Sequence, residues 1–309
     1  MILHRSLRVR ALSALAGVAA FAGAAWAQTP APAAAPEPLW TPLPVENHQM
    51  APGRWKIPLH LAEPAGVERR HEPVRCGVPI PRGALRDTAA VRLEDESGRE
   101  RPLQVESAAW WPDGSIKWAL LDFTLDLKAG EKKAYALHFG QGISRRPAET
   151  PLRVTQDDET ITVDTGRLKF TMLKRKNVFI HEAWLDANGD GKYSEEERVV
   201  AAPTRGELRG LFVDLWHKSR GAQEYWAALD AKPETVEIEA SGPNCVEICF
   251  KGWHRAAAGM DPWSFVAPRA WQYVLRVRAY AGSATLRVYH TFINTEDPLD
   301  IRVRSIGIK

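Results

Sequence analysis

The feature that most limits the fold of this chain is a succession of short extended segments separated by turn signals. Between residues 54 and 140, extended segments are expected at 91–94, 102–107, 115–125 and 132–139. The turn signals between them are Ser97-Gly98, Pro112-Asp113-Gly114 and Ala129-Gly130. Within 115–125, the alternation predicts that Ile116, Trp118 and Leu120 share one face. This block is typical of an antiparallel meander, closed into a small barrel or folded into a sandwich.

A second β-rich block follows a polar linker at residues 141–150 and extends from 151 to 309. Its expected strands lie near 153–156, 160–164, 168–173, 211–216, 235–240, 246–253, 272–279 and 284–292. Thr165-Gly166 and Gly282-Ser283 predict hairpin turns. Long helical periodicity and fixed-period repeats are absent from the sequence, so we expect an all-β chain.

Residues 1–27 have the organisation of a secretory signal peptide. Three arginines precede an apolar run at 11–24, and Ala25-Trp26-Ala27 is a small-x-small cleavage site. Because the apolar run is too short to span a bilayer, we expect no membrane association after cleavage. The mature chain is therefore expected to be secreted or periplasmic, and to begin with a Pro/Ala-rich tether at 28–53.

Cleavage after Ala27 would bring the charge balance of the chain to zero. The first 27 residues contain three of the 41 Lys and Arg and none of the 38 Asp and Glu, so 38 basic residues remain against 38 acidic ones. The pI of 8.7 therefore belongs to the precursor. A neutral mature chain gives no electrostatic reason to expect nucleic-acid binding.

The stretch Asp186-Ala-Asn-Gly-Asp-Gly-Lys-Tyr-Ser-Glu-Glu-Glu197 has the residue spacing of an EF-hand calcium loop. Oxygen-bearing side chains fall at positions 1, 3, 5 and 9, glycine at position 6, and at position 12 a glutamate that can give both carboxylate oxygens. Calcium prefers six to eight oxygen ligands, which explains a ligand set without sulfur or imidazole. We predict one structural Ca2+ held by Asp186, Asn188, Asp190, the carbonyl of Lys192, Ser194 and Glu197.

The same stretch has a simpler interpretation as a hairpin turn, because Asn188-Gly189 and Asp190-Gly191 are strong turn dipeptides. Turn formation alone, however, does not require a glutamate at position 12. Residues 178–185 before the loop are strand-like, and residues 194–202 after it predict a short helix that Pro203 stops. A single such loop in a β-rich chain favours a structural ion over a calcium sensor.

The three cysteines give no clear metal or disulfide pattern. Cys245 and Cys249 lie four residues apart in a strand-like segment, so their side chains would face the same side about 13 Å apart, too far for a disulfide. Cys76 could reach one of them only if the two blocks touch there. We interpret these cysteines as small buried apolar residues.

Tryptophan is abundant, and its faces can stack on sugar rings. Trp110-Trp111, beside the Pro-Asp-Gly turn, is the best candidate for a sugar contact, whereas Trp118 is expected to fill the barrel. His181 lies close to the calcium loop and is interpreted as a structural residue. The sequence contains no hydrolase elbow, metalloprotease helix or phosphate loop, so no catalytic residue is assigned.

Several of these motifs resemble those of the PcRGLX/YetA-like family. The stretches 77–85 (GVPIPRGAL) and 111–118 (WPDGSIKW) resemble its N-terminal barrel, and 164–170 (DTGRLKF) with the hairpin 280–292 resembles its central β-sandwich. The resemblance implies a small RIFT-type β-barrel at 54–140, followed by an antiparallel β-sandwich at 151–309 that carries the EF-hand-like loop at 186–197.

Members of that family include secreted exo-acting rhamnogalacturonan lyases with a large helical region after the sandwich. Together with the signal peptide and the calcium loop, the resemblance leads us to expect a secreted, calcium-binding, non-catalytic N-terminal portion of a polysaccharide-degrading protein that lacks the helical region. It also implies a pectin-type polysaccharide as partner, a sandwich that is incomplete at residue 309, and no lyase activity in these 309 residues alone. The alternative is a free-standing calcium-dependent carbohydrate-binding or structural module.

Overall fold

The computed structural model describes residues 53–309, except 220, 231 and 257–268. The predicted signal peptide, and all but the last residue of the predicted tether, lie outside the described residues. Within the described part, helical structure is limited to the 3-10 turns η1 (Thr88–Ala90), η2 (Glu195–Glu197) and η3 (Ala227–Leu229). None of its helices has the length and apolar character needed to cross a membrane. The predicted all-β class is confirmed.

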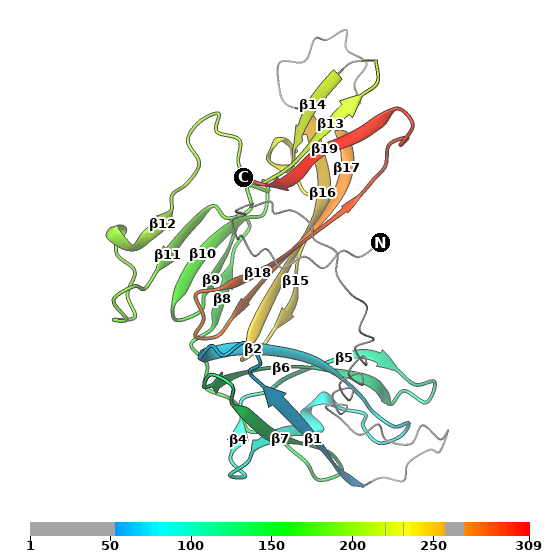
Figure 1. Cartoon of the computed structure of the whole chain (residues 1–309), viewed down its shortest axis with the longest axis vertical. Helices are drawn as coiled ribbons and strands as arrows, with labels where there is room; N and C mark the ends of the chain where they lie inside the picture. Colours follow the sequence, from blue (N-terminus) through cyan, green and yellow to red (C-terminus); the bar gives the residue numbers. More distant parts are fainter. Residues whose placement is uncertain (1–52, 220, 231, 257–268) are drawn as a thin grey trace, which may run out of the picture. The chain divides into compact units, whose positions relative to one another are not determined.

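The first block folds into two antiparallel sheets with the strand orders β1-β7-β3-β4 and β2-β6-β5 (Figure 1). Their strands are β1 (Arg54–Ala62), β2 (Arg69–Pro79), β3 (Val91–Asp95), β4 (Glu100–Arg101), β5 (Gln104–Trp110), β6 (Ile116–Leu127) and β7 (Lys132–Gly140). Leu93 and Leu137 from one sheet share a core with Leu121 from the other. Alternation gives each strand one buried face, so the two sheets cover each other.

The alternation of β6 is interrupted, and this changes the predicted orientation of Trp118. Trp110 pairs with Ile116 and Ala109 pairs with Trp118, so Lys117 is an extra residue in the register. Past this bulge the apolar side chains that enter the core include Ala119, Leu121 and Phe123. Trp118 is 42 % exposed, so the prediction that it fills the barrel was wrong. A one-residue bulge moves every following side chain to the opposite face.

The second block folds into a five-stranded and a seven-stranded antiparallel sheet, drawn in green and in yellow to red in Figure 1. The first has the order β12-β11-β10-β9-β8, with β8 (Arg153–Gln156), β9 (Thr160–Asp164), β10 (Leu168–Leu173), β11 (Glu182–Leu185) and β12 (Arg198–Val200). The second follows the path β18-β17-β16-β14-β13-β19, and β15 also pairs with β16. Its strands are β13 (Leu211–His217), β14 (Gly221–Trp226), β15 (Thr235–Ser241), β16 (Cys245–Ala256), β17 (Arg269–Tyr280), β18 (Leu286–Ile293) and β19 (Ile301–Ile308).

The two sheets of the second block share one core. Phe170 of the five-stranded sheet belongs to the same apolar cluster as Phe250 and Leu275 of the seven-stranded sheet. The predicted hairpin turns after β9 and β17 are present, and the Gly282 N–H donates to the Thr165 carbonyl across 2.7 Å. The two sheets therefore meet through a packed interior and through a hydrogen bond between their turns.

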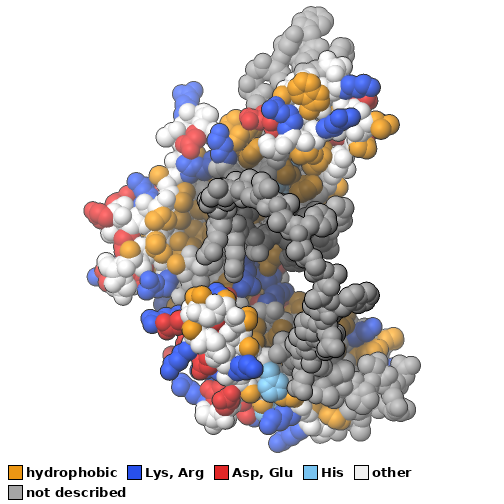
Figure 2. All heavy atoms as spheres, in the orientation of Figure 1, with side chains coloured by type: hydrophobic (Ala, Val, Ile, Leu, Met, Phe, Trp, Pro, Cys, Tyr) orange, Lys and Arg blue, Asp and Glu red, His pale blue; other side chains and the backbone are white. Residues whose placement is uncertain are grey.

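One face of the molecule is shown with all its atoms in Figure 2. On that face, Lys and Arg side chains lie interspersed with Asp and Glu side chains, and hydrophobic atoms are visible between them. This mixing agrees with the equal numbers of basic and acidic residues that follow Ala27 in the sequence.

Candidate functional site

The predicted calcium loop closes a hairpin in the five-stranded sheet. Asp186 directly follows β11, Glu197 is the last residue of η2, and Arg198 opens β12, which pairs back onto β11. The predicted helix after the loop is limited to η2, and the next three residues are strand instead. Most hairpin connections have about two to five residues, so turn formation alone does not explain a loop of this length.

Side-chain oxygens in the first half of the loop accept hydrogen bonds from backbone N–H groups. The buried carboxylate of Asp186 accepts from Gly189 across 2.7 Å and from Gly191 across 3.2 Å. Asn188 Oδ1 accepts from the Asp190 N–H across 2.8 Å. Both glycines have a positive φ, which residues with a Cβ rarely adopt. The chain therefore curls around Asp186, so the side chains of the first positions lie on a tight turn.

Glu197 folds back over the beginning of the loop. Its Oε1 accepts the Ala187 N–H and its Oε2 accepts the Ser194 N–H, each across 3.1 Å. A carboxylate oxygen has more than one lone pair, so these bonds orient Glu197 and leave acceptor capacity for an ion. Position 12 of the loop is thus held against the backbone of position 2, at the start of the loop.

The loop is tied to the sheet behind it by two hydrogen bonds. The Tyr193 hydroxyl donates to Asp164 Oδ1 of β9 across 2.6 Å, and the Asp186 N–H donates to the Arg167 carbonyl across 3.0 Å. Burial and the bond to Asp164 raise the pKa of Tyr193, so its hydroxyl keeps its proton at physiological pH. Both bonds hold the loop in its folded shape.

The donor set fits calcium by its chemistry, since every candidate ligand atom in the loop is an oxygen. The side-chain oxygens are not drawn into one tight cluster. Among the described residues, one group of three acidic, cysteine or histidine ligand atoms lies within 4.8 Å of one another, and it consists of Glu106, Asp122 and Cys245. The loop is therefore shaped by its backbone hydrogen bonds, and an ion would gather its carboxylates.

The tryptophan pair beside the Pro-Asp-Gly turn has one exposed and one fixed member. Trp110 is 58 % exposed. Trp111 Nε1 donates to the Ile80 carbonyl across 2.9 Å, and Lys117 Nζ lies 4.8 Å from the centre of its ring. The backbone N–H of His181 donates to the Thr171 carbonyl, which ties this residue to β10. Because the Trp111 ring is held by these contacts, Trp110 is the tryptophan of the pair whose ring is exposed for contact with a ligand.

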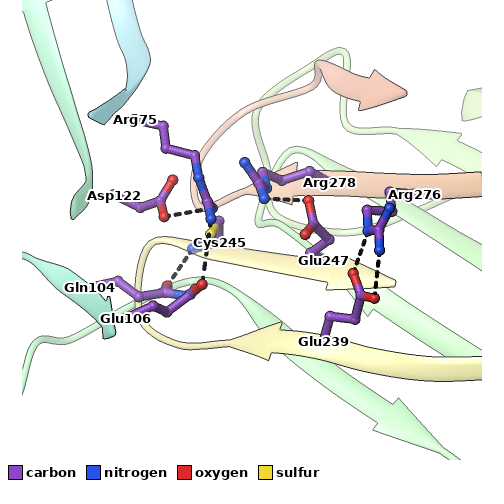
Figure 3. Close-up of polar contacts among 9 residues, drawn as sticks. All are labelled: Arg75, Gln104, Glu106, Asp122, Glu239, Cys245, Glu247, Arg276 and Arg278. Carbon is purple, nitrogen blue, oxygen red and sulfur yellow. Dashed lines mark hydrogen bonds and ion pairs between the residues drawn. The ribbon is translucent and has the colours of Figure 1, made fainter. Parts of the chain in front are cut away.

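A buried polar cluster that the sequence analysis missed lies where β2, β5 and β6 meet the start of β16 (Figure 3). Arg75 donates to Asp122 across 2.9 Å and lies 3.4 Å from a carboxylate oxygen of Glu106. Gln104 Oε1 accepts the Cys245 N–H across 3.0 Å. Burial raises the pKa of the Asp122 carboxyl, although Arg75 acts in the opposite direction.

This cluster is better explained as a structural contact than as a metal site. The Arg75 guanidinium already pairs with both Asp122 and Glu106, so a metal ion would have to displace it. Burial raises the pKa of the Cys245 thiol to about 12, whereas a metal needs the thiolate. All three cysteines are free thiols in the structure.

Two ion pairs continue from this cluster along the seven-stranded sheet (Figure 3). Glu247 of β16 and Arg278 of β17 are direct cross-strand partners, and both are buried. Two residues along β17, Arg276 forms a two-pronged pair with Glu239, with N–O distances of 2.5 and 2.9 Å. We call Glu247–Arg278 the inner pair and Glu239–Arg276 the outer pair. The sequence signal for the inner pair was a charged residue within each of two predicted strands, but predicting the strands does not show that these two charges face each other.

A small barrel followed by an antiparallel β-sandwich defines a class of two-domain, all-β proteins, and two family models match it here. The PcRGLX-like N-terminal RIFT barrel domain matches residues 59–140, and the PcRGLX-like protein central beta sandwich domain matches residues 152–309. The chain therefore belongs to the PcRGLX-like family, as the sequence motifs predicted.

The chain is similar to the protein YetA of Bacillus subtilis (strain 168), with 27 % identity over 237 residues, which cover 76 % of this chain and 25 % of YetA. It thus spans about a quarter of the length of that relative. Among solved structures, an alpha-mannosidase from Enterococcus faecalis V583 matches 80 % of this chain and 31 % of its own, with 12 % identity and a TM-score of 0.43. A glycosyl hydrolase family 38 protein from the same species gives 10 % identity, 80 % and 32 % coverage, and a TM-score of 0.43.

Proposed function

We propose that this chain is the secreted, non-catalytic N-terminal portion of a rhamnogalacturonan-lyase-like protein, and that one calcium ion stabilises its sandwich. Membership of the PcRGLX-like family supports the link to polysaccharide degradation. The observation that carries the calcium part is the folded loop, in which Glu197 returns to Ala187 while Asp186 is buried inside the turn. Asp186, Asn188, Asp190, Ser194, Glu197 and the Lys192 carbonyl would hold the ion.

Calcium would act here by stabilising the folded state. Three carboxylates in one short loop repel each other unless a cation neutralises them. An ion that binds only the folded chain adds about 2.7 kcal/mol when it is present at about 100 times its dissociation constant. For a domain of this size, that free energy corresponds to a rise in melting temperature of several degrees.

The test is calorimetric melting of the purified chain with calcium, with magnesium and with a chelator. Glu197→Ala should abolish most of the calcium effect because it removes both oxygens of position 12, whereas Ser194→Ala should reduce it less. Glu195→Ala is the matched control, since it removes an exposed carboxylate from the same turn. Magnesium should replace calcium poorly, because it requires a tight octahedron. Equal melting temperatures of the wild type in calcium and in chelator would refute the calcium site.

The enzymatic part of the proposal has its own assay. A lyase releases an unsaturated uronate product whose absorbance can be followed. We expect no turnover of rhamnogalacturonan by these 309 residues, since neither the sequence nor the described structure supplies a catalytic constellation. Steady product formation that co-purifies with the chain would contradict its non-catalytic assignment.

A calcium-dependent carbohydrate-binding module is a second candidate, favoured by the exposure of Trp110 and Trp118. Large exposed aromatic rings can stack on sugar faces. Binding of rhamnogalacturonan oligosaccharides can be measured by titration calorimetry. Trp110→Ala and Trp118→Ala should then weaken binding, whereas Trp216→Ala, which removes an exposed tryptophan of the sandwich, should not. If Trp110→Ala and Trp118→Ala bind the oligosaccharides as tightly as the wild type, the surface that carries Trp110 and Trp118 is not the sugar-binding site.

A further inference from the structure

Two histidines approach each other on the core-facing side of the seven-stranded sheet. His254 of β16 lies four residues after the core residue Phe250, and His290 of β18 pairs directly with the core residue Leu275. Residues two or four apart in a strand, and direct cross-strand partners, share one face. The two imidazole rings have their centres 6.0 Å apart, at an interplanar angle of 52°.

The orientation of His254 leaves one ring nitrogen free. Its Nδ1 lies 2.8 Å from the Trp271 carbonyl oxygen, which can only accept, so Nδ1 carries the proton and Nε2 carries a lone pair. His254 is fully buried, and its Nε2 has no hydrogen-bond partner among the residues that the structure describes. A backbone carbonyl that fixes the second nitrogen of a histidine is the usual support of a metal-binding imidazole.

The surroundings add one more unpartnered polar atom. The Nε2 of His290 is buried without a hydrogen-bond partner among the described residues, and the Tyr273 ring packs edge-on with its centre 5.3 Å from that of His254. Burial lowers the pKa of both histidines to about 4, so both are neutral at pH 7. Unsatisfied buried polar groups are costly, so two of them on neighbouring imidazole rings indicate a missing partner.

The backbone is strained at the residue that orients His254. Trp271 has a φ of +52°, which is unfavourable for an aromatic residue, and it forms a bulge in β17. Its ring stacks on Phe292 at 5.4 Å between centres. Phe292 is 47 % exposed, so the cluster lies close to the surface. Such strain is typically retained at functional sites.

We propose that His254 and His290 bind one divalent transition-metal ion through their Nε2 atoms. Two imidazoles on one tetrahedral ion, with Zn–N bonds of about 2 Å, have ring centres roughly 5–6 Å apart. The observed 6.0 Å fits this separation. Imidazole nitrogen selects zinc, copper or nickel rather than calcium, so this site is independent of the calcium loop.

The experiment is a zinc titration of the chain, purified without a histidine tag and saturated with calcium, in competition with a chromophoric chelator. We expect one zinc ion per chain. His290→Gln should weaken binding by at least about tenfold, the loss that even an outer-shell partner of a metal ligand can produce. Because His290 is less buried than His254, this variant is the safer of the two for folding, and its melting curve checks that it folds.

Three controls make the result specific. His217→Gln removes an accessible histidine of β13 and should leave zinc binding unchanged. Glu197→Ala should also leave it unchanged, which separates this site from the calcium loop. Copper should bind more tightly than zinc, as the affinity order of divalent metals requires. Absence of stoichiometric zinc binding, or equal binding by wild type and His290→Gln, would overturn the proposal and leave the cluster as a site for buried water only.

Discussion

The Glu247–Arg278 and Glu239–Arg276 ion pairs in Figure 3 allow a direct test of how burial changes the contribution of a salt bridge to the stability of this sheet. The perturbation is the removal of one partner at a time: Arg278→Met or Glu247→Leu in the inner pair, and Arg276→Met or Glu239→Leu in the outer pair. The pairs lie two residues apart on β17 and consist of the same residue types. They differ in the exposure of the Arg and Glu side chains, 5 and 10 % in the inner pair against 35 and 27 % in the outer pair.

The expected cost follows from that difference. Removal of one partner of a buried pair leaves an uncompensated charge and costs about 3–5 kcal/mol of unfolding free energy. Replacement of both partners by apolar residues of similar volume is often close to neutral. The outer pair is partly hydrated, so its loss should cost about 0.2–1 kcal/mol. Arg278 also faces the buried carboxylate of Asp122, which places the cost of Arg278→Met at the upper end of its range.

Urea unfolding of the wild type, the four single variants and the two double variants gives both coupling energies. The inner cycle should show strong coupling, with the double variant more stable than either single one. The outer cycle should show coupling below about 1 kcal/mol. If Arg278→Met and Arg276→Met prove equally stable, burial does not control these pairs and the reasoning fails.

Two more perturbations test the barrel and the thiols. Gly140→Ala should lower the unfolding free energy by about 3 kcal/mol or more, because the added Cβ would clash with the Gly53 carbonyl oxygen and φ is +102°. Gly98→Ala should cost only about 1 kcal/mol, because its φ is also positive, at +77°, but the added Cβ would lie in open space. Thermal melting compares them, and equal costs would contradict the described packing. Burial raises the thiol pKa to about 11 for Cys76 and Cys249 and to about 12 for Cys245. Alkylation of these thiols in the native chain at pH 8 should therefore be at least roughly 100-fold slower than alkylation of a free thiol. The rate should increase with pH until the pH reaches these pKa values. Rapid labelling of the folded chain, followed by mass spectrometry, would refute this.

The sequence was sufficient to predict the all-β class and most strands, because residue alternation and turn dipeptides are local signals. It failed where local signals stop. Trp118 was assigned to the core because the bulge at Lys117 cannot be seen without the partner strand. The segment after the calcium loop was predicted as helix, but pairing of Arg198–Val200 with β11 prevails over the local preference of three consecutive glutamates.

The candidate site was predictable to a similar degree. The candidate calcium ligands lie within twelve consecutive residues, so their spacing alone predicted a calcium loop, and in the structure Glu197 folds back to Ala187 at the start of that loop. The buried clusters were not predictable. Arg75 and Asp122 are 47 residues apart, and the His254–His290 approach depends on the register of three strands. A pairing of that kind is set by tertiary packing and leaves no periodic signal.

The hydrogen bonds that Gln104 accepts from Asn244 and Cys245 also have a consequence for the order of folding. Each of these bonds joins two residues that are separated by 140 or 141 positions in the sequence. Every strand pair of the barrel, in contrast, lies between Arg54 and Gly140. A chain made from its N-terminus can therefore complete the barrel before the turn that precedes β16 has been synthesised. Until then, Gln104 Oε1 lacks both of these donors. A barrel completed first would therefore present a ready acceptor to the turn that precedes β16.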